Sequence, residues 1–160
     1  MTIAVGDKIP AATLMRMVDG APSPITTEEL FSGKTVVMFA LPGAFTPTCS
    51  AKHLPGFVQM ADAIKDKGVD SIVCMSVNDV FVMNAWGKDQ HVDDKVVLVA
   101  DGNADFTKRI GLELDATKFG MGLRSQRFAL VAKDGTVTQL HIEQPGEFRV
   151  SSADHVLASL

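Results

Sequence analysis

The stretch Thr35-Val-Val-Met-Phe-Ala-Leu-Pro-Gly-Ala-Phe-Thr-Pro-Thr-Cys49 decides the fold, because it joins a buried strand to the start of a helix. Its first seven residues form a continuous apolar run of strand length, which is typical of a strand buried on both faces. Proline is tolerated in the first turn of a helix but not in its interior, so Pro47 predicts a helix that begins here with Thr46 as its N-cap. Cys49 then falls in the first helical turn.

Strand-like and helix-like segments alternate on both sides of this stretch. The capping-box spacing of Thr26-Thr-Glu-Glu29 predicts a short helix before it, and apolar residues at helical spacing from Phe57 to Ile64 predict a longer one after it. Asp134-Gly135 is a strong hairpin signal between two strand-like runs. The remaining segments are predicted strands at 71–77 and 96–100, strands 128–132 and 136–142 around the hairpin, and helices at about 79–90, 105–110 and 151–160.

The order of these elements, β-α-β-α-β-α-β-β-α, predicts a central sheet covered by helices. The closing hairpin makes the sheet mixed, which indicates an α/β thioredoxin-like fold rather than a fully parallel one. The first 25 residues, with Asp19-Gly20 as a turn, are expected to form an N-terminal strand extension. With 160 residues, no repeats and no linker, the chain is expected to form one domain over residues 1–160.

Composition excludes several classes of protein. Hydrophobic residues make up 46% and charged residues 21%, which is ordinary globular usage and excludes disordered and fibrous chains. The net charge is −4 with no basic run, so no nucleic acid is expected as a partner. No apolar stretch approaches the roughly 18 residues of a membrane helix. No signal sequence is recognised and two cysteines are too few for a disulfide scaffold, so the expected location is the cytoplasm.

Cys49 is the strongest candidate for chemistry. Its neighbours form loops rather than core, and a helix start favours an anion such as a thiolate. A helix start alone typically contributes about 0.3–1 kcal/mol, so a nearby cation, an arginine, is expected to complete the site. Cys74 lies inside the apolar run Ile72-Val-Cys-Met75, where it is either inert packing or a redox partner. Both interpretations of Cys74 stay open from the residues alone.

The pattern Pro42-x-x-x-Thr46-x-x-Cys49 resembles the active-site signature of the peroxiredoxins, a family of thiol peroxidases. The longer string from Pro42 to Ser50, followed by His53-Leu-Pro-Gly-Phe57, is similar to the atypical type II or type 5 subfamily. The similarity continues in Ser76-Val-Asn-Asp79, in Ala85-Trp86 and in Arg124-Ser-Gln-Arg-Phe128, and covers nearly the whole chain.

The resemblance implies a role for each matching residue. Cys49 is the expected peroxidatic cysteine, which reduces hydrogen peroxide or an organic hydroperoxide and becomes a sulfenic acid. The hydroxyl of Thr46 is expected to bond the thiolate and the peroxide, and Pro42 to shield the pocket. Arg127 opens strand 128–132 and matches the family's arginine better than Arg124, for which we expect a surface or interface position. The resemblance implies no metal, haem or flavin cofactor.

The resemblance also bears on how Cys49 is recycled. Members of the subfamily often carry a cysteine where Cys74 stands, which in some resolves a disulfide, whereas in others glutathione or glutaredoxin attacks the sulfenic acid directly. Residues 145–155 contain no cysteine, which excludes the C-terminal resolving mechanism of some type 5 members. We expect glutathione and glutaredoxin as reductants, with thioredoxin acting through Cys74 as the alternative. A homodimer is expected near the active-site loops, with Phe45, Phe81 and Trp86 as candidate interface residues.

Other functions on the same residues stay open at this point. A peroxide sensor or a thiol-dependent holdase would use Cys49 with little turnover. A general disulfide reductase needs C-x-x-C, and Thr46 occupies the first of these positions. Cys49 and His53 at i and i+4 could also bind a metal, but no third ligand lies near in sequence. His53 is instead expected to pack or hydrogen-bond beside the pocket.

Overall fold

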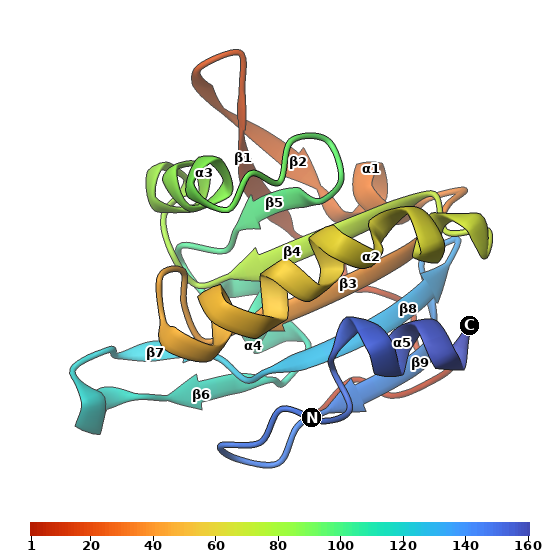
Figure 1. Ribbon diagram of the computed structural model, residues 1–160. Coiled ribbons are helices and arrows are strands. Elements are labelled where there is room, and N and C mark those ends of the chain that lie inside the picture. The colour runs from red at the N-terminus through yellow and green to blue at the C-terminus, as the bar shows by residue number, and fades with distance from the viewer.

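A seven-stranded mixed sheet, in the order β2-β1-β5-β4-β3-β8-β9, forms the centre of the computed structural model, which describes residues 1–160 (Figure 1). Its strands are β1 (Thr13–Val18), β2 (Ala21–Thr26), β3 (Thr35–Leu41), β4 (Ser71–Ser76), β5 (Val97–Ala100), β8 (Phe128–Lys133) and β9 (Thr136–Ile142). The helical segments are α1 (Thr27–Phe31), η1 (Cys49–His53), α2 (Leu54–Asp66), α3 (Val80–Asp89), α4 (Asp105–Arg109), η2 (Thr117–Phe119) and α5 (Ala153–Ser159). No helix in the structure combines the length and apolarity needed to cross a lipid bilayer.

The central strand β3 carries the core on both of its faces. It pairs parallel with β4 and antiparallel with β8, which confirms the mixed sheet and the thioredoxin-like fold. Val37, Phe39 and Leu41 point into one apolar layer, under α2, α3 and α5. Alternate residues such as Val36 and Met38 point into the other layer, with α1 and α4. Successive side chains of a strand face opposite ways, so this continuous apolar run serves both layers at once.

The local signals of the sequence form as expected. Thr26 and Glu29 make the reciprocal capping box of α1, and Asp79 caps α3. Asp134 and Gly135 have φ values of 48° and 76°, so the β8–β9 hairpin turns through two left-handed residues, as a type I′ turn requires. The N-terminal extension is the β1–β2 hairpin, and β1 joins the sheet antiparallel to β5.

One part of the fold differs from the sequence prediction. The sequence predicts no element for residues 111–127, but they contain a second, two-stranded sheet of β6 (Glu113–Asp115) and β7 (Leu123–Ser125), joined through η2. Strands of three residues show no measurable alternation, and Gly120 and Gly122 break any longer pattern with left-handed backbone. This excursion brings Arg124 to Pro42, at the start of the loop that precedes Cys49.

Candidate active site

Cys49 lies at the start of the helical segment that leads into α2. The amide of Ser50 donates to the carbonyl of Thr46 at 2.9 Å, which places Thr46 at the helix start as expected. The Thr46 hydroxyl does not cap the helix, because it donates to the carbonyl of Gly43 at 2.6 Å. From Cys49 the backbone widens into the π-helical turn η1, and the amide of Leu54 donates to the Cys49 carbonyl. Sequence reasoning predicted an ordinary α-helix here; such single π turns are frequent at functional sites.

The structure brings Arg127 to Cys49. Arg127 stands directly before β8, and its Nη2 donates to Cys49 Sγ across 3.2 Å. This guanidinium is the cation that was expected to add to the weak field of the helix start. A hydrogen bond from a charged donor stabilises a thiolate more strongly than a bond from a neutral donor. No carboxylate lies within 4.0 Å of Arg127, since the ion pairs of the chain are Arg109–Asp105 and Arg149–Glu147.

The sulfur is covered in this conformation. Cys49 has no exposed surface, so a peroxide can contact Sγ only after a small movement of the residues that surround it. A cavity of about 600 Å³ lies beside Arg127, and Pro42, Thr48, Phe119 and Phe148 are among its lining residues. Pro42 lines this cavity at the start of the loop that leads to Cys49, and its shielding role stays a prediction.

His53 hydrogen-bonds beside the site, as the sequence predicted. Its ring is buried, with Nε2 2.9 Å from the carbonyl oxygen of Ser151 and Nδ1 2.8 Å from Nη1 of Arg127. A carbonyl only accepts, so Nε2 carries the hydrogen and Nδ1 accepts from the guanidinium. Burial, and after it the charge of Arg127, lower the pKa of His53 from 6.5 to about 3, so the ring is neutral at physiological pH. Both ring nitrogens have protein partners, which leaves none for a metal.

Arg124 does not reach the sulfur. Its side chain is partly buried, donating from Nε to Met121 at 2.9 Å and from Nη1 to the carbonyl of Val77 at 3.2 Å. The surface or interface position expected for Arg124 stays a prediction. The residue is half-buried, and its Nη1 lies 3.5 Å from the carbonyl oxygen of Pro42 in the loop before Cys49. Asn78, which the sequence singled out only within the family resemblance Ser76-Val-Asn-Asp79, accepts from the amide of Ala44 at 2.9 Å and holds the same loop.

Cys74 lies in the middle of β4, opposite Phe39 of β3, and shares an apolar cluster with Cys49. Both cysteines are free thiols. Cys74 has no exposed surface, and burial, together with the proximity of Cys49, raises the pKa of its thiol well above the ordinary value. At neutral pH it is therefore a protonated core residue in this conformation.

Of the three candidate interface residues, one is misplaced. Trp86 is fully buried on α3, and its indole donates to the Ser50 hydroxyl at 3.0 Å, beneath the turn that holds Cys49. It cannot contact a partner from there. Phe45, in the loop before Cys49, and Phe81, in the first turn of α3, are large apolar side chains that are 54% and 63% exposed.

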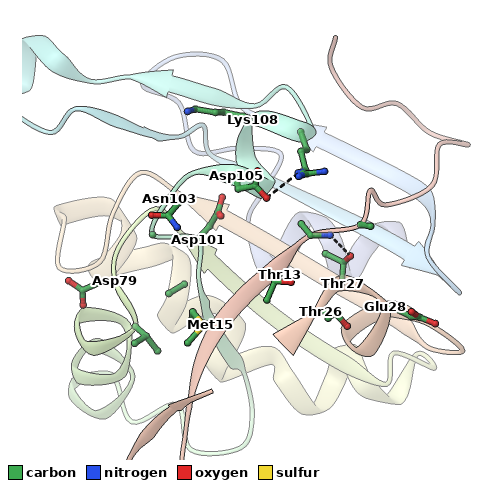
Figure 2. A pocket seen from close by; sticks show the side chains of 16 residues that line it. Thr13, Met15, Thr26, Thr27, Glu28, Asp79, Asp101, Asn103, Asp105 and Lys108 are labelled. Atoms are coloured by element: carbon green, nitrogen blue, oxygen red, sulfur yellow. Dashed lines mark hydrogen bonds and ion pairs between the residues drawn. The ribbon is translucent and has the colours of Figure 1, made fainter. Parts of the chain in front are cut away.

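A larger cavity, of about 910 Å³, lies away from both cysteines, among β1, α1 and the turn before α4 (Figure 2). Several of its charged groups already have structural partners. The carboxylate of Asp101 accepts from the amide and hydroxyl of Thr107 at 2.8 and 2.7 Å. Asp105, labelled in Figure 2, pairs with Arg109 at 3.0 Å. None of the candidate site residues lines it, so the chemistry is assigned to the smaller cavity beside Arg127.

Comparisons with known proteins show to which family the chain is similar. The family model described as Redoxin matches residues 4–157. The chain is 49% identical over 159 residues to Peroxiredoxin-2B of Arabidopsis thaliana, covering 99% of this chain and 98% of that protein. It is 48% identical to the chloroplastic Peroxiredoxin-2E of the same plant, covering 99% of this chain and 70% of the relative. The crystal structure of reduced Prx3 from Vibrio vulnificus in complex with H₂O₂ superposes with a TM-score of 0.95, at 50% identity and 99% coverage of both chains.

Proposed function

This chain belongs to the peroxiredoxin family and is a thiol-dependent peroxidase resembling the type II and type 5 members, and we propose that it works by oxidising Cys49 to a sulfenic acid. The Cys49 thiolate attacks one peroxide oxygen, the O–O bond breaks, and the leaving hydroxide or alkoxide takes a proton to become water or an alcohol. The observation that carries the proposal is the 3.2 Å bond from Arg127 to Sγ.

Thr46 is proposed to orient the peroxide. Its hydroxyl hydrogen is committed to Gly43, so its oxygen is free only to accept a hydrogen bond. A hydroperoxide O–H is a suitable donor to that oxygen, whereas a thiolate is not. Arg127, which carries more N–H donors than Cys49 and His53 use, then stabilises the charge that develops on the leaving oxygen.

Organic hydroperoxides are proposed as substrates alongside hydrogen peroxide. The cavity of about 600 Å³ beside Arg127 is far larger than hydrogen peroxide requires. Pro42, Phe119 and Phe148 give it apolar walls. An alkyl group can occupy that space while the peroxide end reaches toward Cys49.

Glutathione and glutaredoxin are proposed as the reductants of oxidised Cys49. The support comes from Cys74, whose burial in a central strand and raised thiol pKa make it a poor nucleophile toward the sulfenic acid. Reduction by thioredoxin through Cys74 is the alternative, and it requires β4 or the Cys49 turn to move so that the two sulfurs can bond.

A homodimer in the cytoplasm completes the proposal. Phe45 and Phe81 are the apolar side chains offered for the interface, now without Trp86. The cytoplasm is proposed because a reducing compartment keeps both cysteines free and supplies the thiol reductant. Relatives directed to chloroplasts make cell fractionation the direct test of this location.

The test of the catalytic assignment compares Cys49→Ser with Cys74→Ser, a matched removal of one thiol from the same apolar cluster. Cys49→Ser is expected to abolish peroxide consumption, and Cys74→Ser to consume one equivalent of peroxide per chain at the wild-type rate. A cysteine-sulfenic acid reagent should label oxidised wild type and Cys74→Ser at residue 49. Peroxide consumption by Cys49→Ser would overturn the assignment. Repeated turnover with added thiol separates the enzyme from a sensor or holdase.

A further inference from the structure

We propose that Glu143 is a positioning residue of the peroxidase site, which orients the guanidinium of Arg127 by acting through Ser151 and His53. The proposal rests on the role given to Arg127 under "Proposed function". Glu143 does not touch the sulfur, and it was not among the residues that the sequence singled out. Its side chain is 7% exposed, an unusual place for a carboxylate, and its bonds lead toward the site.

Glu143 joins two segments that flank the site. It follows β9 directly, and its amide donates to the carbonyl of Arg127 at 3.0 Å, which fixes the backbone of Arg127 at the end of the β8–β9 pair. Its Oε2 accepts three bonds: from the amide of Arg149 at 2.7 Å, and from the amide and hydroxyl of Ser151 at 2.8 and 2.7 Å. The carboxylate therefore closes the loop of residues 144–150 onto the strand.

Glu143 stays ionised in this setting. Burial alone would raise the pKa of its carboxyl, but the hydrogen bonds from Ser151 and Arg149 to the charged form outweigh burial, and the pKa lies below its ordinary value. An ionised carboxylate accepts three short bonds more strongly than a neutral acid does. The position of Ser151 is thus tightly defined at neutral pH.

The fixed position of Ser151 determines the position of the His53 ring. The Ser151 carbonyl accepts from His53 Nε2 at 2.9 Å and so holds the hydrogen on that nitrogen. The Nδ1 lone pair then faces Arg127 and accepts from Nη1 at 2.8 Å, while Nη2 of the same group donates to Cys49 Sγ at 3.2 Å. A planar guanidinium held at two nitrogens has one orientation, and errors of about 1 Å in such groups can cost about 100-fold in rate.

The chain of contacts also keeps the charge of Arg127 available. A carboxylate in direct contact with the guanidinium would orient it equally well but would compensate its positive charge. Here the only direct side-chain acceptor besides Cys49 itself is neutral His53, and the carboxylate acts through Ser151 and His53. The full positive charge then acts on the thiolate and the leaving oxygen.

The test measures the second-order rate constant for peroxide, with the fluorescence of the single tryptophan, Trp86, as the signal. Glu143→Ala is expected to slow the reaction about 10- to 100-fold. Glu143→Gln, which keeps an acceptor oxygen, should recover most of the rate. Arg149→Ala is the matched control, because it removes an exposed side chain from the same loop and leaves the backbone donor in place. Its rate should equal that of wild type.

The route through His53 is tested by a double-mutant cycle and by NMR. If Glu143 acts through His53, Glu143→Ala should add little to the defect of His53→Leu, whereas independent effects would multiply. The ¹⁵N shifts of His53 should show the Nε2–H tautomer in wild type and a tautomer mixture in Glu143→Ala. Wild-type rates in folded Glu143→Ala, multiplied defects, or an unchanged tautomer would each overturn the proposal. If Arg127→Ala also reacts at the wild-type rate, the proposed role of Arg127 itself has failed.

Discussion

Arg127 Nη2 lies 3.2 Å from Cys49 Sγ, although the two residues are 78 positions apart in the chain. The contact depends on the sheet: β8 runs antiparallel beside β3, so the residue before β8 lies level with the loop that follows β3. The nucleophile and its cation are thus held by segments that adjoin two paired strands of the core, β3 and β8. This contact gives the first prediction.

Replacing Arg127 by alanine should reduce the second-order rate constant for peroxide by about 100- to 1000-fold, the usual effect of removing one preorganised donor to a developing charge. Alkylation of Cys49 by iodoacetamide at neutral pH should slow as well, because the thiolate loses its charged donor. Stopped-flow kinetics and mass spectrometry measure the two rates. If alkylation is unchanged in Arg127→Ala but slow in Arg124→Ala, the cation of the site is Arg124.

Replacing Thr46 by valine should separate peroxide binding from thiolate reactivity. Valine keeps the shape of threonine but has no oxygen to accept the peroxide O–H, and the hydroxyl bond to Gly43 is also lost. The rate constant for peroxide should fall by about 10- to 100-fold, while iodoacetamide alkylation changes little. Thr46→Ser, which keeps the hydroxyl, serves as the control. Equal losses in both reactions of Thr46→Val would mean that Thr46 acts on the sulfur instead.

Replacing Cys74 by serine should leave peroxide turnover with glutathione and glutaredoxin close to that of wild type. The thiol of Cys74 is fully buried and carries a raised pKa, so it contributes little to the resolving step in this conformation. Coupled assays that follow NADPH oxidation compare the glutaredoxin and thioredoxin systems on both proteins. Complete loss of turnover with glutaredoxin in Cys74→Ser would make Cys74 the resolving cysteine.

Replacing Phe81 by glutamate should shift a dimer toward monomer, because a charge would enter the proposed apolar interface. Val5→Glu is the matched control, since Val5 is also exposed, at 61%, but lies in the N-terminal segment. Analytical ultracentrifugation at several protein concentrations measures the state of each. A wild-type chain that stays monomeric at all concentrations would contradict the proposed homodimer.

The sequence predicted most of the fold because its signals are local. The buried run of β3, the capping box at Thr26 and the turn at Asp134-Gly135 each act within a few residues and each formed as expected. The short strands β6 and β7 were not predicted, because three residues are too few to show an alternation of apolar and polar side chains. The π turn at Cys49 was not predicted, because a π turn is built from the same residue types as an α-helix.

Residue types and the family resemblance predicted which residues form the site, but not how they contact one another. Cys49 and Arg127 could be named, but their contact depends on strand pairing across 78 residues. Trp86 was misplaced because a large aromatic residue on an amphipathic helix suits a core or an interface equally well. Glu143 gave no signal at all: its importance lies in three hydrogen bonds to a loop, and no spacing in the sequence records them.

His53 should make the fold sensitive to acid. Its pKa is 6.5 in an unfolded chain and about 3 in the folded one, because burial and Arg127 oppose its charge. Between these pH values the unfolded chain binds a proton on His53 and the folded chain does not. The contribution of His53 to the free energy of unfolding is therefore fully present above pH 6.5 and is lost as the pH falls toward 3. The slope of the unfolding free energy is at most about 1.4 kcal/mol per pH unit.

The unfolding free energy, measured with urea from pH 8 to pH 4, should depend less steeply on pH in His53→Gln than in wild type. His91→Asn, a change at an exposed histidine, should keep the wild-type slope. Parallel curves for wild type and His53→Gln would mean that the folded and unfolded chains protonate His53 alike, which would contradict the lowered pKa of the buried ring.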